Sequence, residues 1–317
     1  MALFRTLADP LQTAVLFLVF NRPNTTTKVL EAIRRAKPPR LYVAADGPRE
    51  GREGEAERVA KVREIATAVD WPCEVRTLFR EKNLGCKYAV SGAITWFFEH
   101  EEQGIILEDD CLPHPDFFTF CETLLDRYAG DDRVSVITGN NFQYGQRRGE
   151  ASYYFSKYNH CWGWASWRRA WQHYQGDLPF WPEWSESDAW PQHTPDKVER
   201  RYWEKIFERV RAGLIDTWAY PWTASVWYHG GLTATPNVNL VSNIGFGPYS
   251  THTASVNSPL AGMATSAIGE LVHPAAISQD QAADRYVFKK AIAGDSVLSR
   301  FNVPLLLRRV VRKIIKR

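Results

Sequence analysis

An apolar run that ends in three consecutive carboxylates constrains the fold of this chain more than any other segment. Residues 105–107 (Ile-Ile-Leu) have the apolar, β-branched character of a short buried strand, and Glu108, Asp109 and Asp110 follow directly. Three adjacent carboxylates cannot all be buried without partners. Open α/β sheets bind their ligands at the carboxyl ends of parallel strands. The segment therefore predicts a ligand site at a strand end, although an acidic loop after an edge strand would have the same composition.

Crowded carboxylate oxygens are hard ligands that suit Mg²⁺ or Mn²⁺, and these ions usually bind substrate phosphates as well as protein. We therefore expect a divalent metal ion and a diphosphate at residues 108–110. Cys111 and His114 lie beside the triplet and leave a zinc site as an alternative, but these softer ligands are few.

Strand-like and helix-like segments alternate through the first half of the chain. Alternation of this kind favours a parallel sheet with right-handed crossovers. We therefore expect an α/β fold with a mostly parallel sheet flanked by helices, whose strand ends line one crevice. Strands are predicted at 13–20, 41–45, 73–79, 105–107 and 134–138, and helices at 25–36, within 49–68, and at 87–99, 116–128 and 197–212.

The second half has a different composition, because eleven of the thirteen tryptophans lie between Trp162 and Trp227. Residues 237–247 are expected to be extended and to end at glycines. No sharp linker separates the halves, so residues 1–300 are expected to form a single domain with two lobes, 13–140 and 141–260. Most of the clustered tryptophans must be core, since so much aromatic surface would not stay exposed.

The charge balance excludes some classes of function. The chain has 39 Lys and Arg against 36 Asp and Glu, and no basic block interrupts its body, so nucleic-acid binding is not indicated. The five cysteines form no CxxC pair, which argues against a zinc ribbon or a disulfide framework and favours a cytoplasmic location. The apolar run at 14–20 is too short to span a bilayer.

The C-terminal residues 305–317 form a separate pattern. Apolar residues occupy 306, 307, 310, 311, 314 and 315, and basic residues occupy 308, 309, 312, 313, 316 and 317. This spacing predicts a two-faced basic helix within 301–317, which is typical of binding at an anionic membrane surface. A terminal helix docked on the body of the protein remains the alternative. We expect peripheral contact with the inner face of the cytoplasmic membrane.

These motifs together resemble those of nucleotide-sugar glycosyltransferases of the GT-A fold. The similarity is closest in 83–85 (Asn-Leu-Gly) and in 106–118, whose Glu-Asp-Asp triplet resembles the Asp-X-Asp motif of Golgi N-acetylglucosaminyltransferases. Residues 161–165, 216–218 and 239–245 are similar to a bacterial glycosyltransferase-like group that is also described as hemolysin-like. The resemblance covers roughly 13–255. It implies a nucleotide-sugar half at 13–140 and an acceptor and catalytic half at 141–260.

The resemblance implies roles for several carboxylates. Asp110 would bind the metal directly, while Glu108 and Asp109 would hold the ribose hydroxyls and metal-bound water. Asp46 matches the carboxylate that reads the uracil N3–H in related enzymes, although an Asp before Gly-Pro is also a common turn residue. His252 would be an additional metal ligand, as a late histidine is in many GT-A enzymes, or else a structural or solvated side chain.

Other residues are candidates because of their chemistry. Arg22 follows the first strand and could pair with phosphate through its planar guanidinium, or lie at the surface. Lys87 is a second candidate for contact with the nucleotide. Asp216 is the leading candidate for the general base that takes the proton of the acceptor hydroxyl, or it caps a helix. The reserve candidates for the base are Asp188, Glu183 and Glu186, and Trp162, Trp164 and Trp218 could offer flat faces to sugar rings.

The sequence therefore predicts a metal-dependent, inverting glycosyltransferase that uses Mn²⁺ or Mg²⁺ and a nucleotide-sugar donor, with UDP as the expected nucleotide. The acceptor would be a cell-surface glycan or a lipid-linked molecule. Two alternatives stay open. One is a sugar-nucleotide nucleotidyltransferase, which usually has a Gly-rich basic loop where this chain has 21–24 (Asn-Arg-Pro-Asn). The other is a carbohydrate-binding protein without activity, which the intact carboxylates disfavour.

Overall fold

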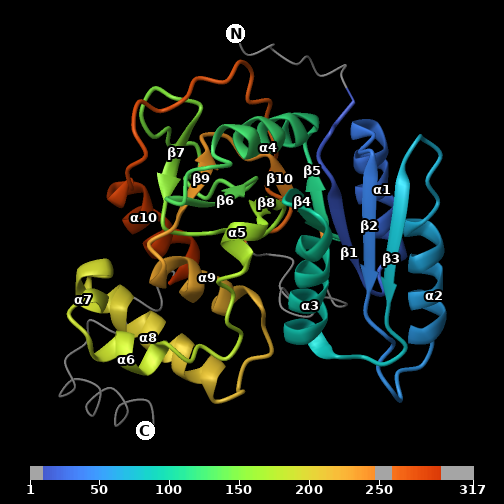
Figure 1. Ribbon diagram of the computed structural model, residues 1–317, viewed down its shortest axis with the longest axis horizontal. Coiled ribbons are helices and arrows are strands. Elements are labelled where there is room, and N and C mark those ends of the chain that lie inside the picture. Colours follow the sequence, from blue (N-terminus) through green and yellow to red (C-terminus); the bar gives the residue numbers. More distant parts are fainter. Residues whose placement is uncertain (1–9, 247–258, 294–317) are drawn as a thin grey trace, which may run out of the picture.

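The computed structural model describes residues 10–246 and 259–293, and an eight-stranded sheet forms its centre (Figure 1). The strand order is β3-β2-β1-β4-β8-β6-β9-β7. All strands run in one direction except β8 and β7, which are antiparallel to their neighbours. The strands are β1 (Val15–Val19), β2 (Arg40–Ala45), β3 (Glu74–Phe79), β4 (Gln103–Glu108), β6 (Val134–Thr138), β7 (Tyr153–Ser156), β8 (Trp164–Trp167) and β9 (Leu232–Pro236).

The expected α/β architecture, a mostly parallel sheet flanked by helices, is confirmed. Each strand predicted in the first half is present within a few residues of its expected bounds, and so is each predicted helix. Two of these helices begin with a proline at the first position, where the missing N–H costs nothing. The helices of this half are α1 (Pro23–Ala36), α2 (Glu55–Ala66), α3 (Gly85–His100) and α4 (Pro115–Arg127).

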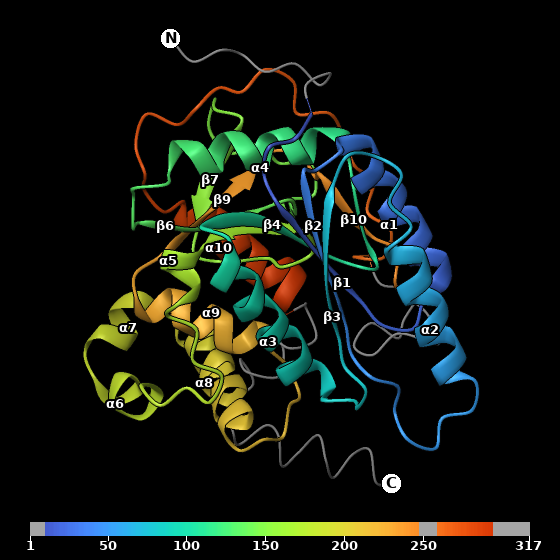
Figure 2. The same cartoon turned by 45° about the vertical axis from the view of Figure 1, so that its right-hand side comes forward.

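The sheet separates two hydrophobic cores, and the side chains of β1 alternate between them. Val15 and Phe17 pack with residues of α1, α2 and α4, whereas Leu16 and Leu18 pack with residues of α3 and the tryptophan-rich second half. Figure 2 shows α4 on one side of the sheet and α3 on the other. Because both faces are covered, β1 is apolar along its whole length, which is typical of parallel sheets.

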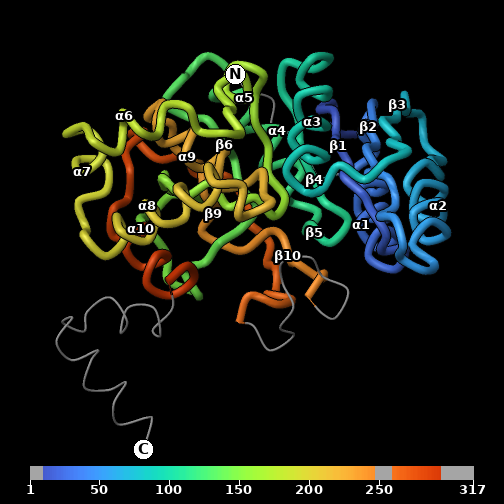
Figure 3. Tube along the Cα trace, turned by 90° about the horizontal axis from the view of Figure 1, so that it is seen from below, coloured from blue at the N-terminus to red at the C-terminus, as the bar shows by residue number. Residues whose placement is uncertain are grey.

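The second half completes the sheet and adds a cluster of short helices. Strand β8 lies between β4 and β6 and pairs antiparallel with both. Figure 3 shows α6, α7 and α8 at the end of the molecule opposite α1 and α2. The predicted helix at 197–212 is present as α8. The helices are α5 (Arg168–Trp171), α6 (Trp181–Glu186), α7 (Ala189–His193), α8 (Lys197–Arg211), α9 (Ala219–Tyr228), α10 (Gln281–Val287) and the π-helical turn η1 (Phe288–Ile292).

A separate two-stranded ribbon lies next to the end of β4. It pairs β5 (Cys111–Pro113) with β10 (Val241–Asn243) in antiparallel orientation. The backbone N–H of Ile244 also donates to the carbonyl of Asp110 at 2.8 Å. The predicted extended segment at 237–247 thus contains β10, and it brings the second half onto the acidic triplet.

No helix within 10–246 or 259–293 has the length and apolar character needed to cross a membrane. The predicted basic amphipathic helix at 305–317 and His252 both lie outside the described residues.

Candidate functional site

The three carboxylates gather at the carboxyl end of β4. Glu108 is the last residue of β4, and Asp109 and Asp110 form the turn into β5. Asp109 and Asp110 are buried, and Asp109 accepts a hydrogen bond from the backbone N–H of Phe20 at 3.1 Å. That contact joins the end of β1 to the end of β4. These are neighbouring strands at the point where the strand order reverses, the place where open α/β sheets bind ligands.

Arg22 lies at the start of α1 and pairs with this cluster. Its guanidinium contacts the carboxylate of Asp110 and lies 3.5 Å from that of Asp109. Its Nε atom is buried and has no hydrogen-bond partner among the described residues. Arg22 therefore meets the acidic triplet from the neighbouring strand, and its side chain stays 20% exposed, so part of the guanidinium could be reached by a phosphate oxygen.

The electrostatics of the cluster are unbalanced, because three carboxylates share one guanidinium. Burial raises the pKa of Glu108 and of Asp109, and the charge on Asp110 adds to the effect in both residues, while Arg22 opposes it. Burial works to lower the pKa of Arg22, but the charges of Asp109 and Asp110 outweigh it and the pKa is raised. A divalent cation would remove the excess negative charge, and carboxylate oxygens are suitable ligands for it.

The cluster alone does not make a complete metal site. Within the described ranges, no three His, Cys, Asp or Glu side chains converge in a way that could hold a metal ion. Cys111 is buried and its thiol donates to Asp110 at 3.4 Å, whereas the ring of His114 accepts from the backbone N–H of Asp116 at the start of α4. A cation here would need ligands from a bound molecule as well as from the protein.

Asp46 follows β2 and holds the loop that leads into α3. Its carboxylate accepts hydrogen bonds from the backbone N–H groups of Gly47, Leu84 and Gly85, at 2.9, 3.0 and 3.1 Å. Burial raises its pKa, and these backbone hydrogen bonds oppose that rise. Asp46 thus has a structural role in holding this loop, and its recognition of a nucleobase stays a prediction.

Asp216 connects the second half to the start of α3. Its carboxylate accepts hydrogen bonds from the backbone N–H of Cys86 at 3.0 Å and of Lys87 at 2.8 Å. Burial, and then the charges on Glu108 and Asp216, raise the pKa of Cys86 to about 12. Cys86 therefore lies within electrostatic range of both carboxylates. The side chain of Lys87 pairs with Asp177 at 2.6 Å.

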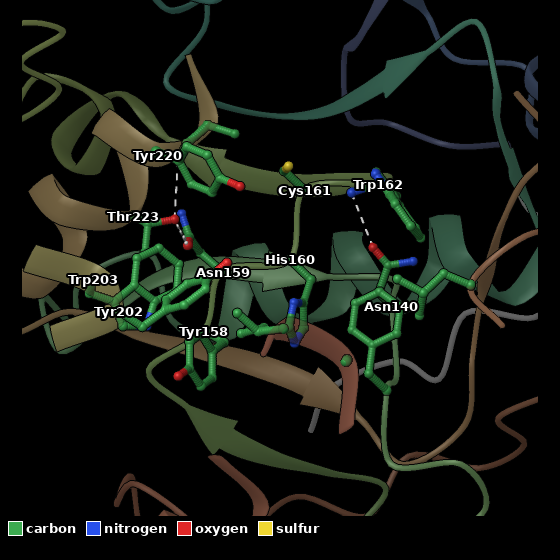
Figure 4. A pocket seen from close by; sticks show the side chains of 15 residues that line it. Asn140, Tyr158, Asn159, His160, Cys161, Trp162, Tyr202, Trp203, Tyr220 and Thr223 are labelled. Carbon is green, nitrogen blue, oxygen red and sulfur yellow. Dashed lines mark hydrogen bonds between the residues drawn. The ribbon is translucent and has the colours of Figure 1, made fainter. Parts of the chain in front are cut away.

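The three predicted sugar-stacking tryptophans have different environments. Trp164 and Trp218 are 1% and 3% exposed and stack on each other with ring centroids 5.7 Å apart, so they belong to the core. Trp162 is partly exposed, and its ring packs edge-on against Phe142 and Phe246. Trp162 lines the cavity shown in Figure 4.

The reserve candidates for the base lie far from the carboxylate cluster. Glu183 and Glu186 are exposed on α6, and Asp188 is exposed before α7. These helices lie at the lower left in Figure 1, away from β1 and β4 near the middle of the molecule. The structure does not bring these three carboxylates to the site.

Two groups at the site were missed from the sequence. Glu55, at the start of α2, is buried and binds both Arg49 and Asn21, and so fixes the turns after β1 and β2. Asn140 follows β6, and its side-chain oxygen accepts from the backbone N–H of Trp162 at 3.1 Å. Asn140 could have been found, because it follows a predicted strand just as the acidic triplet does.

Comparison with known proteins gives a limited result. No protein-family model matches the chain, and no curated protein matches it. Among solved structures, a mannosyltransferase from Pyrobaculum calidifontis in complex with GDP-Man and Mn²⁺ shares 12% identity over 70% of this chain and 71% of its own, with a TM-score of 0.38. The glycosyltransferase GlyE from Streptococcus pneumoniae shares 9% over 70% of this chain and 45% of its own, with a TM-score of 0.32.

A UDP-glucose pyrophosphorylase complexed with UDP-glucose shares 13% identity over 46% of this chain and 62% of its own, with a TM-score of 0.27. Scores and identities this low do not assign an activity to this chain, because one fold can support many functions.

Proposed function

We propose that the chain is a metal-dependent glycosyltransferase that uses a nucleotide-diphosphate sugar. The observation that carries the proposal is the meeting of Arg22 with Asp109 and Asp110 where the strand order reverses between β1 and β4. A diphosphate could pair with Arg22 there, and Asp110 would be the protein ligand of a divalent cation. When bound, Mn²⁺ or Mg²⁺ would neutralise the charge that develops on the leaving diphosphate.

Within this proposal, Glu108 and Asp109 hold the ribose and metal-bound water, and Lys87 contacts the nucleotide. Asp46 favours UDP as the nucleotide, provided that the uracil N3–H replaces one of its backbone donors. Asp216 is the general base of an inverting reaction, supported by its position between α3 and the second half. His252 is proposed as a further ligand of the metal.

The proposal is tested by calorimetric titration of UDP in Mn²⁺ and again in EDTA. We expect binding only with the metal, and loss of binding in Asp110→Asn. Asp126→Asn is the matched control, since Asp126 is exposed on α4 and binds only the Gln103 side chain among the described residues. Titration with GDP under the same conditions tests whether the site prefers uracil to guanine. Unchanged UDP binding in Asp110→Asn would contradict the proposal.

The same protein separates the alternatives. Slow, metal-dependent release of UDP from one UDP-sugar supports a transferase. Formation of a sugar nucleotide from a nucleoside triphosphate and a sugar phosphate indicates a nucleotidyltransferase instead. Glycan binding without either reaction indicates a binding protein.

We also propose that residues 305–317 bind an anionic surface at the inner face of the cytoplasmic membrane, where the acceptor would be a lipid-linked molecule or a cell-surface glycan. The six basic residues of this segment support the idea. Sedimentation with vesicles that contain phosphatidylserine tests it. Equal binding by the full chain and by a variant without 305–317 would contradict it.

A further inference from the structure

An aromatic cavity of about 270 Å³ opens in the second half of the molecule (Figure 4). Six aromatic side chains contribute to its wall, together with smaller residues from α9 and η1. Flat aromatic walls favour flat ligands, because stacked and edge-on ring contacts add to the burial of apolar area. The six are Phe142, Tyr158, Trp162, Tyr202, Trp203 and Tyr220.

The cavity is adjacent to the carboxylate cluster. Trp162 lines the cavity, and its ring packs against that of Phe246 with centroids 5.8 Å apart. The preceding residue, Gly245, packs directly against the carboxylate of Asp110. A molecule in the cavity would have one end close to the place where the donor is proposed to bind.

The wall carries no formal charge. None of the described residues that line the cavity is Asp, Glu, Lys or Arg. His160 also lines it, and burial lowers the pKa of its imidazole to about 3, so the ring is neutral near pH 7. An ionised ligand would lose its hydration here without gaining a partner, which is costly. The cavity therefore suits an uncharged ligand.

The hydrogen-bonding groups of the wall are only partly engaged by the protein. The side-chain oxygen of Asn159 accepts from the hydroxyl of Thr223 at 2.7 Å, and that of Asn140 accepts from the backbone N–H of Trp162. Within the described residues, the His160 ring, the Tyr220 hydroxyl and the buried Nε1 of Trp203 have no hydrogen-bond partner in the protein. These groups could satisfy the polar atoms of a ligand, while the aromatic wall gains most from the burial of apolar area.

The volume limits the size of the ligand. An apolar cavity of about 150 Å³ holds benzene, so about 270 Å³ corresponds to roughly a dozen non-hydrogen atoms, the size of two fused rings. We propose that this cavity binds an uncharged, flat and mainly apolar group that carries one hydroxyl. Its assignment as the aglycone part of the acceptor rests on the proposed transferase function, but binding itself does not.

The experiment measures binding of 2-naphthol to the full chain by calorimetry and by quenching of tryptophan fluorescence. Naphthalene-2-sulfonate tests the exclusion of charge, and methyl β-glucoside tests the exclusion of sugar. We expect 2-naphthol to bind, with no detectable binding of the other two. UDP binding in Mn²⁺ is measured on the same samples, so failure of the cavity and failure of the donor site are seen separately.

Two variants fill the cavity, Ala219→Leu and Ala291→Leu, and each is expected to abolish 2-naphthol binding. Ala60→Leu, on the exposed face of α2, is the control and should bind as the unmodified chain does. His160→Phe should weaken the binding of 2-naphthol by about fivefold, which corresponds to the loss of one hydrogen bond. The affinity for naphthalene, which has no hydroxyl, should not change. Binding of the glucoside in place of 2-naphthol, or equal binding by the filled variants, would overturn the proposal, as would no binding of any probe.

Discussion

Gly245 packs directly against the carboxylate of Asp110. A Cβ at position 245 would overlap the Oδ2 atom of Asp110 and would lie 2.6 Å from Nη1 of Arg22. The loop after β10 can therefore cover the carboxylate cluster only because position 245 has no side chain. The requirement is for space, since this glycine has no positive φ angle.

Gly245→Ala is expected to displace Asp110 or the loop and to weaken UDP binding in Mn²⁺ by tenfold or more, about 1.4 kcal/mol. Gly130→Ala is the matched control, because a Cβ at Gly130 would meet no atom within 4 Å. Titration of both variants with UDP checks this. Equal affinities in the two variants would show that the close approach is unimportant for binding.

Arg22→Gln is expected to lower the free energy of unfolding by about 3 kcal/mol, because it leaves buried carboxylates without their counter-ion. Mn²⁺ should then raise the melting temperature more in this variant than in the unmodified chain, as it replaces the missing positive charge. Thermal melts with and without Mn²⁺ provide the measurement. Arg35→Gln, which removes an exposed partner of Glu31 on the same helix, should change neither value appreciably.

The Asp216→Asn variant distinguishes a catalytic role of Asp216 from a purely structural role as a cap of α3. If Asp216 is the general base, release of UDP from the sugar nucleotide should fall by about 100-fold or more, with UDP affinity nearly unchanged. Asp196→Asn is the control, since Asp196 accepts two backbone N–H groups at the start of α8 in the same way. Turnover that is retained in Asp216→Asn would leave this residue with the structural role alone.

Glu55 gives a prediction for pH. Its hydrogen bond with Arg49 lowers its pKa to about 2 from a usual value near 4.5. A lowered pKa in the folded state means that the stabilisation is present above pH 4.5 and is lost as the pH falls toward 2. Glu55→Gln should therefore cost about 1–2 kcal/mol at pH 7, a figure reduced for the exposure of Arg49, and much less near pH 3. Urea denaturation of both proteins at the two pH values measures this difference, and a constant difference would contradict it.

Much of the first half could be predicted from the sequence, because its signals are local. The apolar run at 105–107 gives β4, and the carboxylates that follow must lie at its end, whichever strands lie beside it. Arg22 and Asp46 were placed at neighbouring strand ends by the same argument. What they bind could not be predicted, since the contact of Arg22 with Asp110 depends on packing between segments 88 residues apart.

The second half was less predictable for the same reason. Trp164–Trp167 has no alternation of apolar and polar residues, because this strand is buried along its whole length, and nothing local marks it as β8. The contacts of Asp216 with Cys86 and Lys87 join residues about 130 positions apart. Sequence reasoning could identify Asp216 as a candidate but could not show that it caps α3.

The position of β8 has a consequence for the order in which the chain can fold during synthesis. Strand β6 leaves the ribosome before β8, yet its neighbours in the sheet are β8 and β9, which come later in the chain. Until residue 167 has been made, β4 has an open edge and β6 has no partner within the described sheet. Unpaired edges of this kind favour association between chains. Because β9 is the partner of both β6 and β7, open edges persist until residue 236 has been made, and the growing polypeptide is exposed to aggregation over that interval.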